Sequence, residues 1–254
     1  MTKTLLETDA LTVRFGGHVA VDAVSSSFHA GELTAIMGPN GAGKTTYFNL
    51  ISGQIPASSG TVKLQGEDIT RLGVADRCRR GIGRAFQLTN LFPSLSALEN
   101  VRLVIQSQQH KGFGLFSMAD SHTELTAAAM AILERVRLDN QKDQLVSELS
   151  HGDQRKLEVA LLIGLDPLVY MFDEPTAGMS VDEAPVILDL IAEIKEDRTR
   201  TVLLVEHKLD VIRSLADRII VLHNGALAAD GAPAEVMASA VVQEAYLGKE
   251  LDHV

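Results

Sequence analysis

Apolar positions along the chain first follow the spacing of strands, then that of helices, and finally an alternation of the two. In the opening region, short apolar stretches bounded by turn residues predict strands at residues 8–15, 21–28, 33–37 and 60–64. Turns separate these strands, so we expect a partly antiparallel layer near the start of the chain.

The middle of the chain carries a helical period. From about residue 88 to residue 165, apolar residues recur three and four positions apart. This spacing predicts helices over 97–106 and 125–136. We therefore expect a helical insert between the opening strands and the last third of the chain.

The last third alternates between the two periods. Strands are predicted at 168–172, 201–206 and 218–222, and helices at 181–196 and 209–216. Such alternation predicts a parallel sheet covered by helices, with residues 230–254 as a short tail. We thus expect one α/β domain over 1–254, with a core of approximately 1–87 and 166–254 and a helical subdomain of approximately 88–165.

Composition narrows the class of protein. A hydrophobic fraction of 46% is ample for a buried core, and there is no run of eighteen apolar residues and no signal-type segment, so we expect an intracellular protein. The single cysteine, Cys78, excludes an intrachain disulfide. A net charge of −10 argues against nucleic acid as a partner, because duplex binding needs a basic face. The cluster of Arg77, Arg79, Arg80 and Arg84 is expected to be a solvated or carboxylate-paired helix end.

The strand predicted at 33–37 leads into a run that matches GxxxxGK[ST], and a predicted helix over 44–51 follows. In such a loop, backbone N–H groups surround nucleotide phosphates, the lysine reaches the outer phosphates, and glycines allow close approach. The alternative is a glycine-rich turn without a ligand. We expect ATP to bind here, in contact with Gly38, Pro39, Asn40, Gly41, Ala42, Gly43, Lys44, Thr45 and Thr46.

Two adjacent acids, Asp173 and Glu174, end a strongly apolar stretch. Open parallel sheets place their ligands at this end of the strands. We expect Asp173 to bind Mg²⁺ together with the hydroxyl of Thr45, and Glu174 to act on the attacking water. Taken alone, the same residues are equally compatible with a strand that ends at Pro175 and has solvated acids.

Two further polar residues are candidates for the same site. His207 ends the predicted strand at 201–206, where it could reach the γ-phosphate, although a single histidine at a strand end is more often a packing residue. Gln87 lies where the opening strands give way to the helical insert. Its amide could contact Mg²⁺ or water and so sense the γ-phosphate.

The stretch from Leu149 to Gln154 precedes an expected helix over 155–163. Ser150 and Asp153 have the spacing of a capping box, which would begin that helix. A serine hydroxyl and the amide of Gly152 at a helix N-terminus also suit an anion. One nucleotide cannot easily use both this turn and the phosphate loop, so we expect a head-to-tail dimer in which each subunit closes on the other's phosphates.

With this order of motifs, the chain resembles the ATP-binding subunits of ABC transporters over nearly its whole length. The resemblance implies a P-loop NTPase core of the RecA-like type and an antiparallel β layer. It implies that Phe15 stacks on adenine, Asp173 serves Mg²⁺, Glu174 is the general base and His207 holds the γ-phosphate. Ser150 and Gly152 would contact ATP across a dimer of this chain or of a close paralogue.

Several short segments resemble the branched-chain amino acid importer branch of this family, which includes importers of urea and short amides. These segments are residues 14–17, 81–87, 176–179 and 244–248. Related ATPases drive lipopolysaccharide export. The resemblance implies transmembrane permease subunits that dock beside Gln87 and residues 88–96, a substrate-binding protein as an indirect partner, and a peripheral position on the cytoplasmic face of the membrane.

Two positions depart from the family pattern. LSHGDQ replaces the usual LSGGQ, which places Asp153 near a phosphate, and residues 177–180 lack a common acid. Two other functions also remain as alternatives. A soluble ABC-type ATPase in DNA repair or translation is disfavoured by the acidic charge and the single nucleotide domain, and a nucleotide sensor without turnover is disfavoured by the presence of Glu174.

Overall fold

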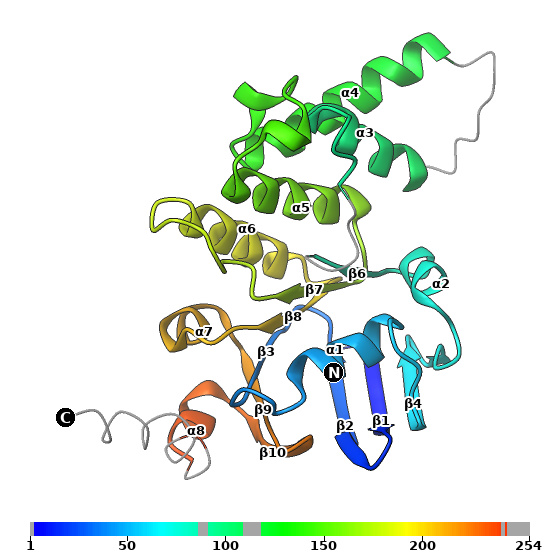
Figure 1. Cartoon of the computed structure of the whole chain (residues 1–254), viewed down its shortest axis with the longest axis vertical. Helices are drawn as coiled ribbons and strands as arrows, with labels where there is room; N and C mark the ends of the chain where they lie inside the picture. The colour runs from blue at the N-terminus through cyan, green and yellow to red at the C-terminus, as the bar shows by residue number, and fades with distance from the viewer. Residues whose placement is uncertain (1–2, 86–90, 109–117, 240–241, 243–254) are drawn as a thin grey trace. The chain divides into compact units, whose positions relative to one another are not determined.

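The computed structural model describes residues 3–85, 91–108, 118–239 and 242 (Figure 1). The chain divides into two compact units, which are described separately. The first holds the residues up to 82, residues 168–174 and the residues from 194 onwards. The second holds residues 83–167 and 175–193, so it includes the segment that follows Glu174 as well as the predicted insert.

An antiparallel sheet opens the first unit. Its order is β2 (His18–His29), β1 (Thr4–Phe15), β4 (Ser59–Leu64) and β5 (Glu67–Asp68), and each neighbouring pair is antiparallel (Figure 1). The antiparallel layer is therefore confirmed for the strands predicted at 8–15, 21–28 and 60–64, whereas the strand predicted at 33–37 lies in the other sheet. β1 and β2 are longer than expected because Gly16 and Gly17 form a tight turn that pairs Phe15 directly with His18.

The second sheet follows the order β10-β9-β3-β8-β7-β6. β3 pairs in parallel with β8 and β9, and β7 pairs in parallel with β8, as the alternation of strands and helices predicted. The strands are β3 (Leu33–Met37), β6 (Ile82–Arg84), β7 (Val169–Asp173), β8 (Thr201–Val205), β9 (Arg218–His223) and β10 (Ala226–Gly231).

The expectation of a plain tail from residue 230 was wrong. β10 runs antiparallel to β9 as far as Gly231, and α8 (Pro233–Met237) follows it. Asn224 and Gly225 both adopt positive φ, 47° and 79°, which is the backbone of a tight hairpin turn. An Asn-Gly pair between apolar stretches is the sequence signal for such a hairpin.

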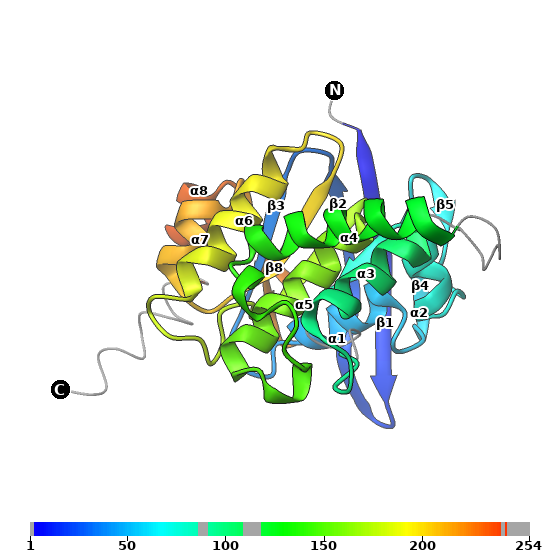
Figure 2. The ribbon, with the colours of Figure 1, turned by 90° about the horizontal axis from the view of Figure 1, so that it is seen from above.

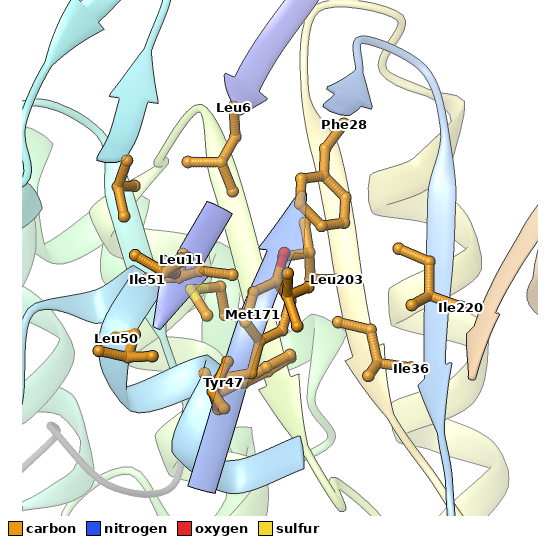
Figure 3. Close-up of a cluster of buried hydrophobic side chains, with 14 of the residues drawn as sticks. Leu6, Leu11, Phe28, Ile36, Tyr47, Leu50, Ile51, Met171, Leu203 and Ile220 are labelled. Atoms are coloured by element: carbon orange, nitrogen blue, oxygen red, sulfur yellow. The ribbon is translucent and has the colours of Figure 1, made fainter. Parts of the chain in front are cut away.

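The helix α1 (Lys44–Ser52) packs against both sheets, and its side chains form part of the main core (Figure 3). Tyr47, Leu50 and Ile51 of this helix are buried in one cluster with side chains of both sheets. Because strand side chains alternate between faces, Ile36 of β3 points into this cluster whereas its neighbours do not. The core therefore holds rigidly the helix that begins at the phosphate loop.

The opposite face of the parallel sheet is covered by α7 (Leu209–Leu215) and α8, which lie next to each other (Figure 2). Ala35 and Met37 of β3 point to this side, and Ile212 of α7 and Val236 of α8 pack against the same cluster. The sheet strands are thus apolar on both faces, which explains why they read as continuous apolar stretches.

The arginine cluster is only in part the solvated or carboxylate-paired helix end that the sequence predicted. Arg79 and Arg80 do pair with carboxylates, those of Asp76 and Glu67. Arg77, on α2 (Val74–Arg79), is only 2% exposed, and no carboxylate of the described residues pairs with it. Its guanidinium donates to four carbonyl oxygens, of Leu50, Ile51, Thr70 and Leu72, and so satisfies the end of α1. Burial lowers the pKa of Arg77 to about 10, which leaves it charged at neutral pH.

The second unit is helical, as the three- and four-residue spacing predicted. α3 (Ala97–Gln108), α4 (Met118–Arg135) and α5 (His151–Leu165) pack against one another. Short 3₁₀ turns, Asp139–Gln141 and Val146–Glu148, connect α4 to α5. α6 (Ala184–Glu196) belongs to this unit as far as Glu193.

Candidate functional site

At two positions of the phosphate loop, the backbone conformation and the close approach of neighbouring backbone leave room only for glycine. Gly43 precedes α1 with φ of 98°, and a Cβ there would lie 2.5 Å from the carbonyl oxygen of Ala20. A Cβ on Gly38 would lie 2.2 Å from the carbonyl oxygen of Leu222. Both glycines therefore let the loop pass close to neighbouring backbone. The loop leads from the carboxyl end of β3 to the N-terminus of α1, which is a suitable position for an anion.

A pocket of about 420 Å³ in the first unit gathers most of the predicted nucleotide residues. Its volume is in the range of small-molecule sites. Sequence reasoning missed His18 and Ala20, although the short turn after Phe15 is a signal that the next strand returns beside it. The pocket is lined by Phe15, His18, Ala20, Asn40, Gly41, Ala42, Gly43, Lys44, Thr45, Thr46, Glu174 and His207.

Phe15 stands at the open side of this pocket with 54% of its surface exposed. A large exposed aromatic ring is unusual at the end of a strand and suits stacking on a flat base. His18 lies opposite Phe15 in the β1–β2 pairing, so the same hairpin brings both rings to the pocket.

Lys44 carries the positive charge of the pocket. Its ammonium donates to the carbonyl oxygens of Gly38, at 2.7 Å, and Pro39, at 3.1 Å, and so curls back over the loop. Burial lowers the pKa of Lys44, while the charges of Glu174 and Asp173 raise it and offset part of that effect.

Glu174 and His207 meet at the carboxyl ends of two neighbouring parallel strands. The Nε2 atom of His207 lies 2.8 Å from Oε1 of Glu174. Glu174 has φ of 51°, a strained value for a residue other than glycine, and its N–H donates to the carbonyl of Val205 at 2.9 Å. The strained turn after β7 aims the carboxylate into the pocket.

The remaining predicted residues of this unit are placed around the pocket without lining it. Asp173 is buried at the end of β7, next to Glu174, and Gly38 and Pro39 form the start of the loop without lining the pocket. Among the residues that the structure describes, no three His, Cys, Asp or Glu side chains converge on a metal. Mg²⁺ keeps several waters and needs few protein ligands, so the hydroxyl of Thr45 and the carboxylate of Asp173 suit it. Gln87 lies outside the described residues.

In the second unit, Ser150 is the N-cap of α5, as predicted, but the Asp153 side chain bonds to the Ser150 hydroxyl and not to its backbone N–H as in a full capping box. Its hydroxyl oxygen accepts from the N–H of Asp153 at 3.1 Å and donates to Oδ2 of the Asp153 carboxylate at 2.8 Å. Burial raises the pKa of Asp153, but hydrogen bonds from Lys156 and Ser150 outweigh it, and the pKa lies below its ordinary value. Ser150 is thus the N-cap of a well-formed helix, and Gly152 lies in its first turn.

Known proteins resemble the chain over nearly its whole length. Residues 21–177 match the family model for the ABC transporter, and residues 227–252 match that for the branched-chain amino acid ATP-binding cassette transporter. The high-affinity branched-chain amino acid transport ATP-binding protein BraF of Pseudomonas aeruginosa is 35% identical over 254 residues, covering 98% of this chain and 100% of BraF.

Solved structures share the fold. MJ1267, an ATP-binding cassette of an ABC transporter in its ADP conformation, superposes with a TM-score of 0.80 at 30% identity, over 97% of this chain and 100% of that one. The ATP-binding cassette MJ0796, a dimer in a post-hydrolysis state with ADP and Pi, gives a TM-score of 0.78 at 26% identity, over 90% and 99% of the two chains. None of the described helices has the length and apolar character needed to cross a bilayer.

Proposed function

This chain belongs to the ATP-binding subunits of ABC transporters, and from that premise we propose that it powers an importer of branched-chain amino acids or of related amides or urea. Family membership makes it a transport ATPase with a P-loop fold. The observation that carries the proposal is the phosphate-loop pocket with Glu174 and His207 hydrogen-bonded at its wall.

We assign the roles as follows. Lys44 and the loop amides bind the phosphates of ATP, and Phe15 stacks on the adenine. Glu174 accepts the proton of the attacking water, and His207 orients Glu174 and holds the γ-phosphate. Mg²⁺ would neutralise the phosphate charge, with Thr45, Asp173 and Gln87 as its protein ligands.

A dimer completes the site in this proposal. Ser150 and Gly152 at the start of α5 offer a hydroxyl, an amide and the positive end of a 15-residue helix. A second subunit, either this chain or a paralogue, would receive these groups on its bound ATP. Support comes from the capped geometry of α5 and from the dimer described for MJ0796.

The second unit also offers a surface for a permease. Phe92 is 52% exposed and Leu145 is exposed as well, on segments that pair at Ser96 and Leu145. The side chain of Asn100, itself buried, accepts from the N–H of Phe92 and donates to the carbonyls of Phe92 and Ser96, which holds this segment in place. A transmembrane subunit docked there would retain the chain on the cytoplasmic face of the membrane.

The proposed substrate class depends on similarity to BraF and to the branched-chain family model. An exporter of the lipopolysaccharide type remains the alternative, since its ATPase would use the same pocket. A substrate-binding protein would act on the far side of an importer and would not contact this chain directly.

The proposed clamp is tested by measuring the mass of Glu174→Gln by size-exclusion chromatography with light scattering, with and without MgATP. A nucleotide-dependent shift from monomer to dimer supports the clamp, because the substitution removes the base but not the phosphate contacts. Lys44→Ala, made on the same background, should abolish the shift. A monomer at saturating MgATP contradicts self-association and leaves the paralogue or the permease as the required partner.

A further inference from the structure

An ion cluster at the start of α5 is not used by the proposed mechanism. The ammonium of Lys156 lies 2.8 Å from Oδ1 of Asp153 and 3.4 Å from Oε1 of Glu183. Lys156 is buried, and both of its partners are mostly covered. One lysine therefore serves two carboxylates, one on the helix and one on the segment that follows Glu174 in the chain.

Glu183 is held firmly against this helix end. Its Oε2 accepts from the N–H of Ser180 at 3.1 Å and from the Ser180 hydroxyl at 2.9 Å. A Cβ on Gly152 would lie 2.5 Å from Oε1 of Glu183, so the carboxylate packs directly on the glycine backbone. Gly152 thus makes room for an acid beside the turn that would have to approach ATP.

The charges at this turn oppose that approach. Asp153 and Glu183 together carry two negative charges, and Lys156 reduces the local total to one. At distances of a few ångströms, a second uncompensated carboxylate would repel a polyphosphate strongly in a partly buried site. The Ser150 hydroxyl also donates its hydrogen bond to the Asp153 carboxylate. To bind a phosphate, the hydroxyl would have to donate to the phosphate instead.

We propose that Lys156 is a positioning residue that makes this acidic turn compatible with ATP across the dimer. Its ammonium holds the two carboxylates in place and compensates the negative charge of Asp153. The Ser150 hydroxyl can then turn from Asp153 to a phosphate. Lys156 also links the start of α5 to the segment after Glu174 through Glu183. This inference depends on the dimer of the proposed function.

The test is the MgATP concentration that gives half-maximal dimer on the Glu174→Gln background. Lys156→Met should raise this concentration about tenfold or more, because truncating the buried member of a partly exposed ion cluster leaves the two carboxylates uncompensated. Lys156→Arg should retain the parental value. Adding Asp153→Asn to Lys156→Met should recover most of the loss, since it restores the local charge.

Two controls separate this role from folding. Lys195→Met removes another partly buried lysine, paired with Asp217 at 2.8 Å, and should leave the half-maximal concentration unchanged. Binding of a fluorescent ATP analogue to monomers should be the same in parent and Lys156→Met, because the phosphate loop is untouched.

The outcomes are distinct. A parent that dimerises while Lys156→Met dimerises equally well overturns the role of Lys156 alone. Failure of Asp153→Asn to recover dimerisation, with unfolding temperatures unchanged, also overturns it. A parent that stays monomeric at saturating MgATP overturns the contact across a dimer of two copies of this chain and, with it, the role of Lys156 in that contact.

Discussion

At the scale of single residues, the site depends on side chains whose backbone is under constraint. Glu174 has a positive φ that its side chain makes costly, and the hydrogen bond from its N–H to Val205 helps to hold this conformation. The turn places the carboxylate next to His207. A carboxylate held by strained backbone and one neighbour is sensitive to small changes in either.

Glu174→Gln should lower the rate of ATP hydrolysis by about 10²- to 10⁴-fold, because the amide cannot accept the proton of water. Affinity for ATP should stay within about twofold, since the loop contacts remain. Phosphate release and nucleotide titration measure the two effects. The exposed Glu235, substituted in the same way, should change neither, and near-normal turnover in Glu174→Gln would remove this residue from the role of base.

Gly43→Ala should destabilise the protein by about 2–4 kcal/mol and weaken ATP binding, because a Cβ at φ of 98° would also meet the Ala20 carbonyl. Gly41→Ala is the matched comparison. It has φ of 81° but nothing within 4 Å of the added Cβ, so it should cost only about 1 kcal/mol. Thermal unfolding gives the difference, and equal losses would show that close approach at Gly43 is unimportant.

At the scale of elements, the position of α1 matters more than its own helix propensity. The helix is nine residues long, too short to be stable alone, and it is fixed by burial of one face and by Arg77 at its end. The same helix begins at Gly43, so its stability sets the geometry of the phosphate loop. Arg77 therefore acts on the site from the far end of the helix.

Arg77→Met should lower the unfolding temperature by about 5–10 °C, because four carbonyls lose a buried charged donor at a cost of about 2–4 kcal/mol. Arg79→Met removes an exposed ion pair with Asp76 and should cost less than about 1 kcal/mol. Calorimetry or circular dichroism measures both variants. Equal effects would mean that the buried guanidinium contributes no more than a surface pair.

At the scale of the whole molecule, the nucleotide pocket belongs to one compact unit and the α5 turn to the other. Each unit has its own packed interior. In the proposed function, the first unit binds ATP and the second presents the α5 turn to another subunit. The exposed Phe92 and Leu145, where we propose that a permease docks, lie on the helical unit.

In cells that also produce its permease, the chain should sediment with membranes, and without the permease it should stay in the supernatant. Phe92→Asp should lower the membrane fraction several-fold, because a charge would be buried at the docking surface. Leu227→Asp alters another exposed apolar residue and should have no effect. Membrane binding that survives Phe92→Asp would place the docking surface elsewhere.

Much of this picture follows from local sequence. The phosphate loop, the acids after β7, the Ser150 cap and the two sheets could be predicted because each depends on residues close together in the chain: a glycine pattern, an apolar run or a capping pair. The β9–β10 hairpin could have been predicted too, since Asn224 and Gly225 carry its turn signal.

Tertiary structure decided what depends on distant residues. The sequence determined that Arg77 is charged, but only packing against the end of α1 made it a buried cap, because its acceptors are up to 27 positions away. In the same way, Asp153 could be recognised as an acid near the expected phosphate. Its pairing with Lys156 is a local contact three positions apart on α5. Glu183 joins the pair only because the segment after Glu174 packs on α5, and no local pattern encodes that contact.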